Sequence, residues 1–307
     1  MAKAEAVAGT QRYLRVEHVM GMPVSIDVRD PPADLSERAA AEALDEAFAL
    51  LRAVDARFST YKEDSEVSRL ARGELREADA SPELREVLAL CERVRRESDG
   101  WFDIRAAGLP ASPDPSGLVK GWAVERVARL LRTRGMRDLC VNAGGDVRVL
   151  GAAEPGTGRA WRVGVRDPAD PLRIVTVVGA QVPEGDGDGC AVATSGNYER
   201  GEHVLDPHSG QPARGLASAT VVGPDLTFAD AYATAAFAMG WQALRWADRL
   251  PGYGVFLVAP GGYTAWNTEF TRYLPRSGRT PKSQPCHSPP TAGPKADGAP
   301  SEHQSHA

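Results

Sequence analysis

The sequence is poor in cysteine, and its few cysteines show no paired spacing. The 307-residue chain contains Cys91, Cys140, Cys190 and Cys286. A disulfide framework or a zinc knuckle needs closely spaced pairs, so the pattern supports neither. Three of the four lie in apolar stretches. This predicts buried or unreactive thiols, because a free cysteine behaves as a small hydrophobe.

Long apolar runs and basic tracts are also missing. No stretch approaches the length of a membrane span. The formal net charge is -5 without any basic cluster, which argues against a nucleic-acid partner or an anionic membrane. No strongly apolar run of a secretory leader precedes Gln11. We therefore expect a cytoplasmic protein, unless the sequence begins after a removed leader.

The composition divides the chain into three parts. Residues 13–274 carry the apolar patterns of one folded domain, and residues 1–12 are predicted to form a flexible N-terminus. Residues 275–307 are rich in Pro, Ser, Gly, Lys and His and almost lack large apolar side chains. This composition predicts a disordered tail whose histidines are solvated.

Helical and strand patterns both occur, so the domain is predicted to be α+β. Strands are expected over 13–28 with a break at Gly21, over 138–150 around a Gly-Gly turn, and over 161–165, 174–178, 190–193, 218–222 and 255–258. Helices are expected over 36–58, after a cap at Ser65, over 81–94, over 117–135, and over 227–248 with Thr227 and Asp230 in capping-box spacing.

Two neighbouring stretches collect the groups that suggest chemistry. Residues 193–210 combine hydroxyls, a histidine, an aspartate and glycines around a strand and turn. In the next helix, Asp230 and Thr234 lie four residues apart and therefore point the same way. Two hard oxygen ligands near a helix start suit magnesium, which shares substrate phosphates. The alternative interpretation is that Asp230 only caps the helix and Thr234 only packs.

Eight motifs in order resemble the FAD:protein FMN transferase (ApbE) family over roughly residues 15–258. They begin at Met20 (MGMP), Phe58 (FSTY, with DSEVSRL from Asp64), Asp99 (DGWFD), Lys120 (KGWAVE), Val141 (VNAGGD), Thr194 (TSGNYER), His203 (HVLDPHSG) and Ala229 (ADAYAT). The resemblance implies an α+β, T-fold-related fold with two layers, helices and an antiparallel sheet, and an FAD cleft. It also implies magnesium, and transfer of FMN from FAD to a Thr or Ser hydroxyl of an acceptor flavoprotein with release of AMP.

The resemblance also assigns roles to individual residues. It implies that magnesium binds to Asp230, to Thr234 and to a backbone carbonyl at Gly117. It places Asp114 and Lys120 near the cofactor, Ser195 at the pyrophosphate or acceptor, and the flavin or adenine pocket at Met20, Tyr61, Trp101, Phe102, Asp103 and Leu205. We interpret His203 as the base that accepts the acceptor hydroxyl proton, because a neutral imidazole is available near pH 7. Its alternative role is a hydrogen bond beside the turn at Asp206.

Two departures from the family pattern and two competing functions stay open. The segment between Asp103 and Asp114 is short, which leaves the closure of that side of the cleft undefined. Glu125 stands where the family usually has aspartate. An FAD pyrophosphatase would use the same metal and cleft but transfer FMN to water. A non-catalytic FAD-binding protein is disfavoured by the joint presence of Asp230, Thr234 and His203.

Overall fold

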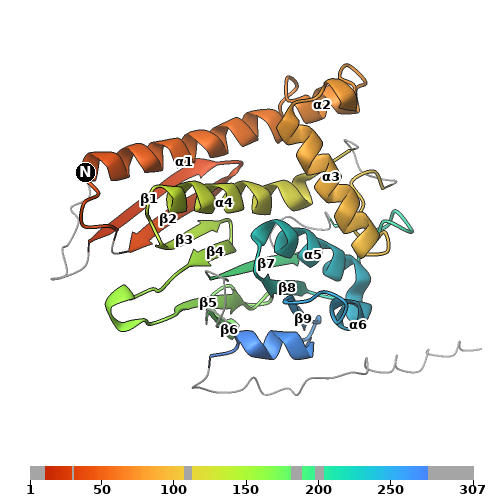
Figure 1. Cartoon of the computed structure of the whole chain (residues 1–307). Coiled ribbons are helices and arrows are strands. Elements are labelled where there is room, and N and C mark those ends of the chain that lie inside the picture. The colour runs from red at the N-terminus through yellow and green to blue at the C-terminus, as the bar shows by residue number, and fades with distance from the viewer. Residues whose placement is uncertain (1–10, 30, 107–112, 181–188, 198–203, 276–307) are drawn as a thin grey trace, which may run out of the picture.

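One antiparallel sheet of eight strands forms the centre of the computed structural model (Figure 1). The structure describes residues 11–29, 31–106, 113–180, 189–197 and 204–275. The strand order is β1-β2-β3-β4-β7-β8-β9-β10, and a separate two-stranded ribbon consists of β5 and β6. The strands are β1 Arg12–Val19, β2 Met22–Arg29, β3 Asp138–Ala143, β4 Asp146–Leu150, β5 Trp161–Arg166, β6 Ile174–Ala180, β7 Cys190–Gly196, β8 Ser218–Gly223, β9 Gly254–Val258 and β10 Thr264–Trp266.

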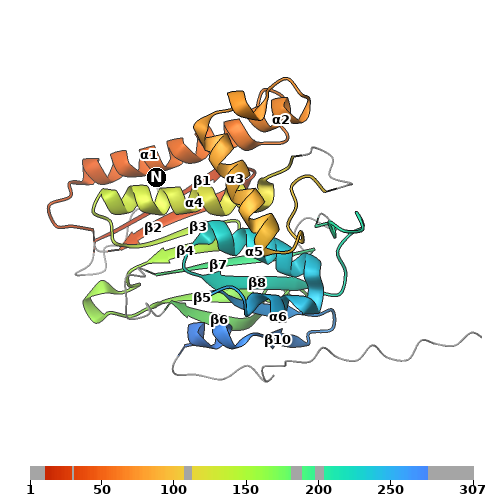
Figure 2. The same ribbon diagram turned by 45° about the vertical axis from the view of Figure 1, so that its right-hand side comes forward.

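The principal helices cover one face of this sheet, and the ribbon lies on the other face (Figures 1 and 2). The α+β prediction is thus confirmed. The α-helices are α1 Glu37–Phe58, α2 Glu66–Ala71, α3 Pro82–Glu97, α4 Ser116–Thr133, α5 Leu226–Met239 and α6 Ala243–Ala247, and a 3-10 helix spans Thr268–Tyr273. Across the described ranges, no helix combines the length and the apolar character that crossing a membrane requires.

The first two strands form the hairpin that the alternating pattern predicts. Met20 and Gly21 both have positive φ, 57° and 73°, which is the requirement of the two-residue turn that matches strand twist. Val24 and the other apolar residues of β2 are buried beneath the helices. In β1 the predicted apolar face points outward instead, because Leu14 is 56% exposed and Val16 59%. The core contribution of β1 comes from Val19, which is buried, and from Tyr13, which packs against the core.

Serine caps begin three of the helices, and the caps at Ser65 and Ser81 are the predicted ones. The side chains of Ser36, Ser65 and Ser81 accept hydrogen bonds from the backbone N–H three residues on, at 3.2, 3.0 and 3.2 Å. Each bond satisfies one of the donors that a helix start leaves unpaired. The caps fix where α1, α2 and α3 begin.

The prediction for residues 227–248 is wrong in two respects. Asp225, not Thr227, caps α5, because its Oδ1 accepts from the Thr227 N–H at 2.8 Å. The helix also ends at Met239, since Gly240 adopts φ 66° and ψ -139°. That backbone conformation favours glycine and ends the α-helical hydrogen-bond pattern. The rest of the predicted helix becomes a 3-10 turn and the short α6.

Two apolar cores lie on opposite faces of the sheet. The larger one fills the space between the sheet and the helices, and the smaller one joins the sheet to the ribbon and the final 3-10 helix. Phe256 stacks on Trp266 and Phe270 in the smaller core. Burial raises the pKa of the free thiols of Cys91, Cys140 and Cys190 to about 12, which fits the predicted unreactive role. Cys286 lies outside the described residues.

Helices α4 and α5 approach most closely at Gly121. A Cβ added there would lie 2.2 Å from the carbonyl oxygen of Leu226 and 2.9 Å from Cβ of Asp230. Glycine is therefore required by the space between the two backbones rather than by its φ angle. The Gly121 N–H donates to Asp230 Oδ2 at 2.9 Å across the same contact.

Gly121→Ala should destabilise the fold by about 2–4 kcal/mol, because the backbone of α5 must move to admit a methyl group. The free energy of unfolding, measured with urea, checks this expectation. Gly156→Ala is the matched control, since no atom lies within 4 Å of the added Cβ, and it should change stability by less than ~0.5 kcal/mol. Equal effects of the two substitutions would contradict the role of the α4–α5 contact.

Candidate active site

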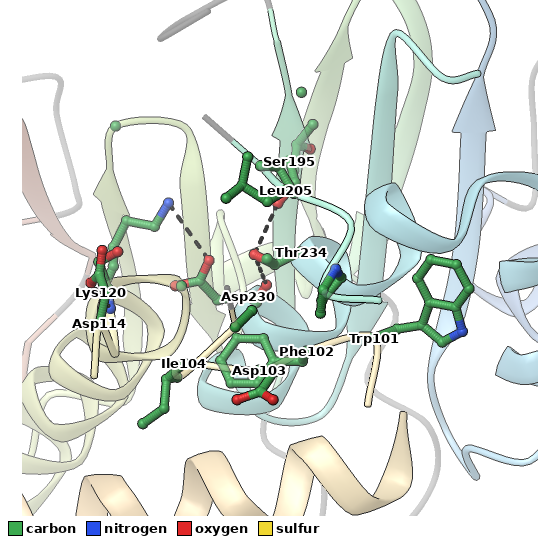
Figure 3. Close-up of a pocket in the computed structure, with 18 of the residues that line it drawn as sticks. Trp101, Phe102, Asp103, Ile104, Asp114, Lys120, Ser195, Leu205, Asp230 and Thr234 are labelled. Carbon is green, nitrogen blue, oxygen red and sulfur yellow. Dashed lines mark hydrogen bonds and ion pairs between the residues drawn. The ribbon is translucent and has the colours of Figure 1, made fainter. Parts of the chain in front are cut away.

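A polar cavity of about 390 Å³ lies where the start of α4 meets α5 (Figure 3). The segments that line it come from seven regions of the chain: the β1–β2 turn, residues 101–106, residues 114–120, the β3–β4 turn, the end of β7, residues 204–207, and α5. The sheet and the helix layer thus contribute together, and no single stretch of sequence makes the site.

Asp230 lies on α5 and is 4% exposed. Its Oδ2 accepts from the Gly121 N–H, and its Oδ1 is 3.7 Å from Nζ of Lys120. Burial raises the pKa of Asp230 to about 7; the ammonium of Lys120 opposes the rise, and the charge of Asp146 adds to it. A buried carboxyl held near neutrality is a feature of functional sites rather than of packing.

Asp146 is a second buried carboxylate, which contacts the cavity residue Lys120, and the sequence predicted no role for it. It begins β4, is 2% exposed, and its Oδ1 accepts from the Thr194 N–H at 3.1 Å. Its Oδ2 is 2.6 Å from Nζ of Lys120 and, apart from that ion pair, has no hydrogen-bond partner among the described residues. One ammonium group therefore faces two buried carboxylates.

Hydroxyl groups flank these carboxylates. Thr234 Oγ1 lies 3.3 Å from Ser195 Oγ and donates to the Asp230 carbonyl oxygen at 3.3 Å. Gly117 is adjacent, because a Cβ added there would lie 3.3 Å from Thr234 Oγ1. The structure thus brings together three predicted metal ligands, Gly117, Asp230 and Thr234, with Lys120 and Ser195.

The predicted cofactor-binding residues of the 101–114 region also line the cavity. Phe102 is buried and Trp101 is partly exposed, with its ring 4.6 Å from that of His208 at an interplanar angle of 81°. Asp114 accepts from the Ser116 N–H at 3.0 Å at the start of α4. Asp103 and Leu205 line the cavity too. This side of the cavity is built on turns rather than on the sheet.

Three predicted site residues are not placed in the cavity. Met20 occupies the hairpin turn, while its neighbours Gly21 and Met22 line the cavity. Tyr61 lies in the turn after α1 and is 96% exposed. His203 lies outside the described residues, although Val204 and Leu205, which follow it in the sequence, line the cavity.

Glu125 connects the site to its supporting elements. Its carboxylate accepts from Arg148 Nε at 2.9 Å and from the Leu226 N–H at the start of α5 at 3.1 Å. Glu125 and Arg148 are both buried, 5% and 7% exposed. The longer arm of glutamate, noted above as a departure from the family pattern, therefore holds the N-terminus of α5 against α4 and β4.

Solved structures share the fold of this chain. A flavin transferase ApbE from Vibrio cholerae superposes with a TM-score of 0.72, at 22% identity, over 87% of this chain and 100% of that chain. The ApbE protein of Thermotoga maritima gives 0.71, also at 22% identity, over 87% of this chain and 100% of that chain. The helix-covered antiparallel sheet is thus the fold of the solved flavin transferases.

Sequence comparison gives the family itself. The ApbE family profile matches residues 20–112 and 110–257, well over half of the sequence. The chain belongs to the ApbE family. An FAD:protein FMN transferase from Rhodobacter capsulatus is 37% identical over 140 residues, 43% of this chain and 25% of that protein. One from Escherichia coli K12 is 30% identical over 173 residues, 52% of this chain and 47% of that protein. The matches span less than half the length of these curated relatives.

Asp230→Asn should change how stability depends on pH in buffer that contains a chelator. The pKa of Asp230 is about 7 in the fold against an ordinary 3.8, so the folded protein retains a proton that the unfolded chain releases. This contribution to stability is present below about pH 4 and is lost as the pH rises to about 7. The free energy of unfolding of the wild type should therefore fall, relative to that of Asp230→Asn, by on the order of 1–3 kcal/mol as the pH rises across that window.

Urea unfolding of both proteins at several pH values between 4 and 8 measures this difference. Asp34→Asn serves as control, because Asp34 is exposed, and its offset from wild type should stay flat with pH. A flat offset for Asp230→Asn as well would show that Asp230 is ionised throughout the range.

Proposed function

We propose that this protein transfers FMN from FAD to a Thr or Ser hydroxyl of an acceptor flavoprotein and releases AMP. The observation that carries the proposal is that Lys120 and Asp230 line one cavity with the hydroxyls of Ser195 and Thr234. The buried carboxylate of Asp146 pairs with Lys120 from behind. The names of the curated relatives, FAD:protein FMN transferase, support the same activity.

The donor set of the cavity fits magnesium. The carboxylate of Asp230, the hydroxyls of Ser195 and Thr234 and the backbone near Gly117 supply hard oxygen atoms, which Mg²⁺ prefers and combines with substrate phosphates. The carboxylate of Asp146 lies next to them, paired with Lys120. Within the described ranges no three His, Cys, Asp or Glu residues cluster as a metal site, so a shared site completed by phosphate oxygens suits this chain better than an all-protein cage. When bound, the ion would neutralise charge on the pyrophosphate. Asp230 and Thr234, with a carbonyl at Gly117, would hold it.

The transfer reaction needs charge neutralisation and positioning more than covalent chemistry by the protein. The acceptor oxygen forms a bond to the phosphorus of the FMN half, the bond from that phosphorus to the bridging oxygen breaks, and AMP leaves. The ammonium of Lys120 supplies positive charge at the polar end of the cavity, where Asp146 holds it. Ser195 and Thr234 offer hydroxyl donors in the same place.

The proton of the acceptor hydroxyl needs a base during this step. We assign that role to His203, as the sequence predicts, because a neutral imidazole accepts a proton near pH 7. Val204 and Leu205, the next residues in the sequence, line the cavity, which supports the assignment. The acceptor hydroxyl oxygen becomes the phosphoester oxygen, and the proton passes to the imidazole.

Asp230→Ala should lower magnesium-dependent turnover of FAD at least about 100-fold, while FAD binding persists, because cavity contacts away from the metal ligands remain. The measurement is AMP release and acceptor mass in the presence of FAD, magnesium and an acceptor domain. Asp34→Ala, which removes an exposed carboxylate, is the matched control and should retain full activity. Unchanged turnover in Asp230→Ala would refute the metal assignment.

The same assay separates the competing functions. An acceptor mass gain of one FMN, dependent on magnesium, establishes the transferase. Release of AMP and free FMN without an adduct would instead indicate an FAD pyrophosphatase. Bound FAD without AMP release would indicate a binding protein.

Asp146→Asn and Lys120→Met should each lower kcat/KM for FAD about 10- to 100-fold, because each removes one half of the buried ion pair. The double variant should be little worse than the poorer single variant, since the two side chains act as one unit. Kinetics of the three variants test this coupling. Effects that multiply would show that Asp146 and Lys120 act independently.

A further inference from the structure

Two hollows at the surface adjoin the cavity at Trp101, on the side opposite Lys120. The two hollows, of about 470 and 530 Å³, share Trp101 and Met239, and Trp101 also lines the cavity. Figure 3 shows Trp101 and Lys120 on opposite sides of the labelled residues. We call these two hollows together the Trp101 groove; its main lining residues are Trp101, Gln211, Arg214, Met239, Gln242 and Arg245.

The charge of the Trp101 groove is unbalanced. Arg214 and Arg245 are exposed, one in each hollow, and neither has an ion-pair or hydrogen-bond partner among the residues described. Asp99 pairs with Arg249 at 2.5 Å. Asp206 accepts from the Ser209 hydroxyl at 2.8 Å and from the backbone N–H of His208 at 2.9 Å and keeps its charge. The groove is thus lined by three arginines against two carboxylates.

The floor of the Trp101 groove is apolar. Met239 and Trp246 are 6% and 5% exposed, and the partly exposed Trp101 stands where the two hollows meet. An apolar floor with polar and charged walls suits an extended polypeptide, because side chains bury on the floor while charges pair at the rim. The two arginines favour acidic side chains in such a segment.

We infer that the Trp101 groove binds the acceptor segment that flanks the target hydroxyl, and that Arg214 and Arg245 select acidic residues in it. The inference rests on the proposed function, because a protein acceptor is the substrate of that transfer. The cavity of about 390 Å³ admits a side chain but no folded protein, so the flanking residues must lie outside. The Trp101 groove adjoins the cavity at Trp101 and can hold them there.

Three designed acceptors test this selection. Each is an inert carrier protein that ends in a segment of about 20 residues with one central threonine, flanked by aspartate, asparagine or lysine. Wild type should flavinylate the aspartate acceptor with kcat/KM about three- to tenfold above the lysine acceptor. Arg214→Glu/Arg245→Glu should reverse that preference and leave the dissociation constant for FAD unchanged. Arg162→Glu, an exposed site on β5 outside the groove, should retain the wild-type preference.

The outcomes distinguish this inference from the function on which it rests. Adducts on all three acceptors at equal rates, or an equal loss on all three in the double variant, would overturn the groove assignment and leave the transferase standing. A weakened FAD affinity in the double variant would overturn it too and assign the groove to the AMP half of FAD. AMP release by wild type without any adduct would refute the transferase, and the groove assignment with it.

Discussion

The contact between α4 and α5 at Gly121 is the constraint on which the site depends. Because residue 121 has no side chain, the two backbones lie close enough for its N–H to reach the carboxylate of Asp230. That single approach places the start of α4, with Gly117 and Lys120, beside the first turns of α5. Glu125, one turn further along α4, fixes the same pair of helices through the N-terminus of α5. The packing of α4 against α5 therefore also sets the relative positions of the site residues.

The electrostatics of the site oppose the stability of the fold. Two carboxylates, Asp146 and Asp230, are removed from water and share the ammonium of Lys120, and a buried charge without full compensation is costly. The apolar cores on both faces of the sheet offset that cost. The magnesium ion proposed above would supply the positive charge that this group lacks.

Local signals predicted much of the fold and part of the site. Serine caps, the hairpin turn and strand alternation are set by near neighbours in sequence, so their positions were correct. The cap of α5 was misplaced because Asp225 and Thr227 are both residue types that cap helices. The end of α5 was misplaced because the sequence does not show that Gly240 adopts the positive φ that ends the helix. Asp146 escaped notice because an acid after a Gly-Gly turn resembles an ordinary strand start. Its partner Lys120 lies 26 positions away in the sequence, and only the fold brings them together.

The strand order follows the chain everywhere except at β4 and β7, which pair across the inserted β5–β6 ribbon. Two neighbouring pairs, β2–β3 and β4–β7, join strands far apart along the chain and must each close a long loop, and loop closure slows folding. Pairing of β5 with β6 shortens the effective length of the loop between β4 and β7. The hydrogen bond from Thr194 to Asp146 spans this same junction. We therefore expect the carboxylate pair to assemble late in folding, so that a partly folded chain holds its acidic groups apart and in water.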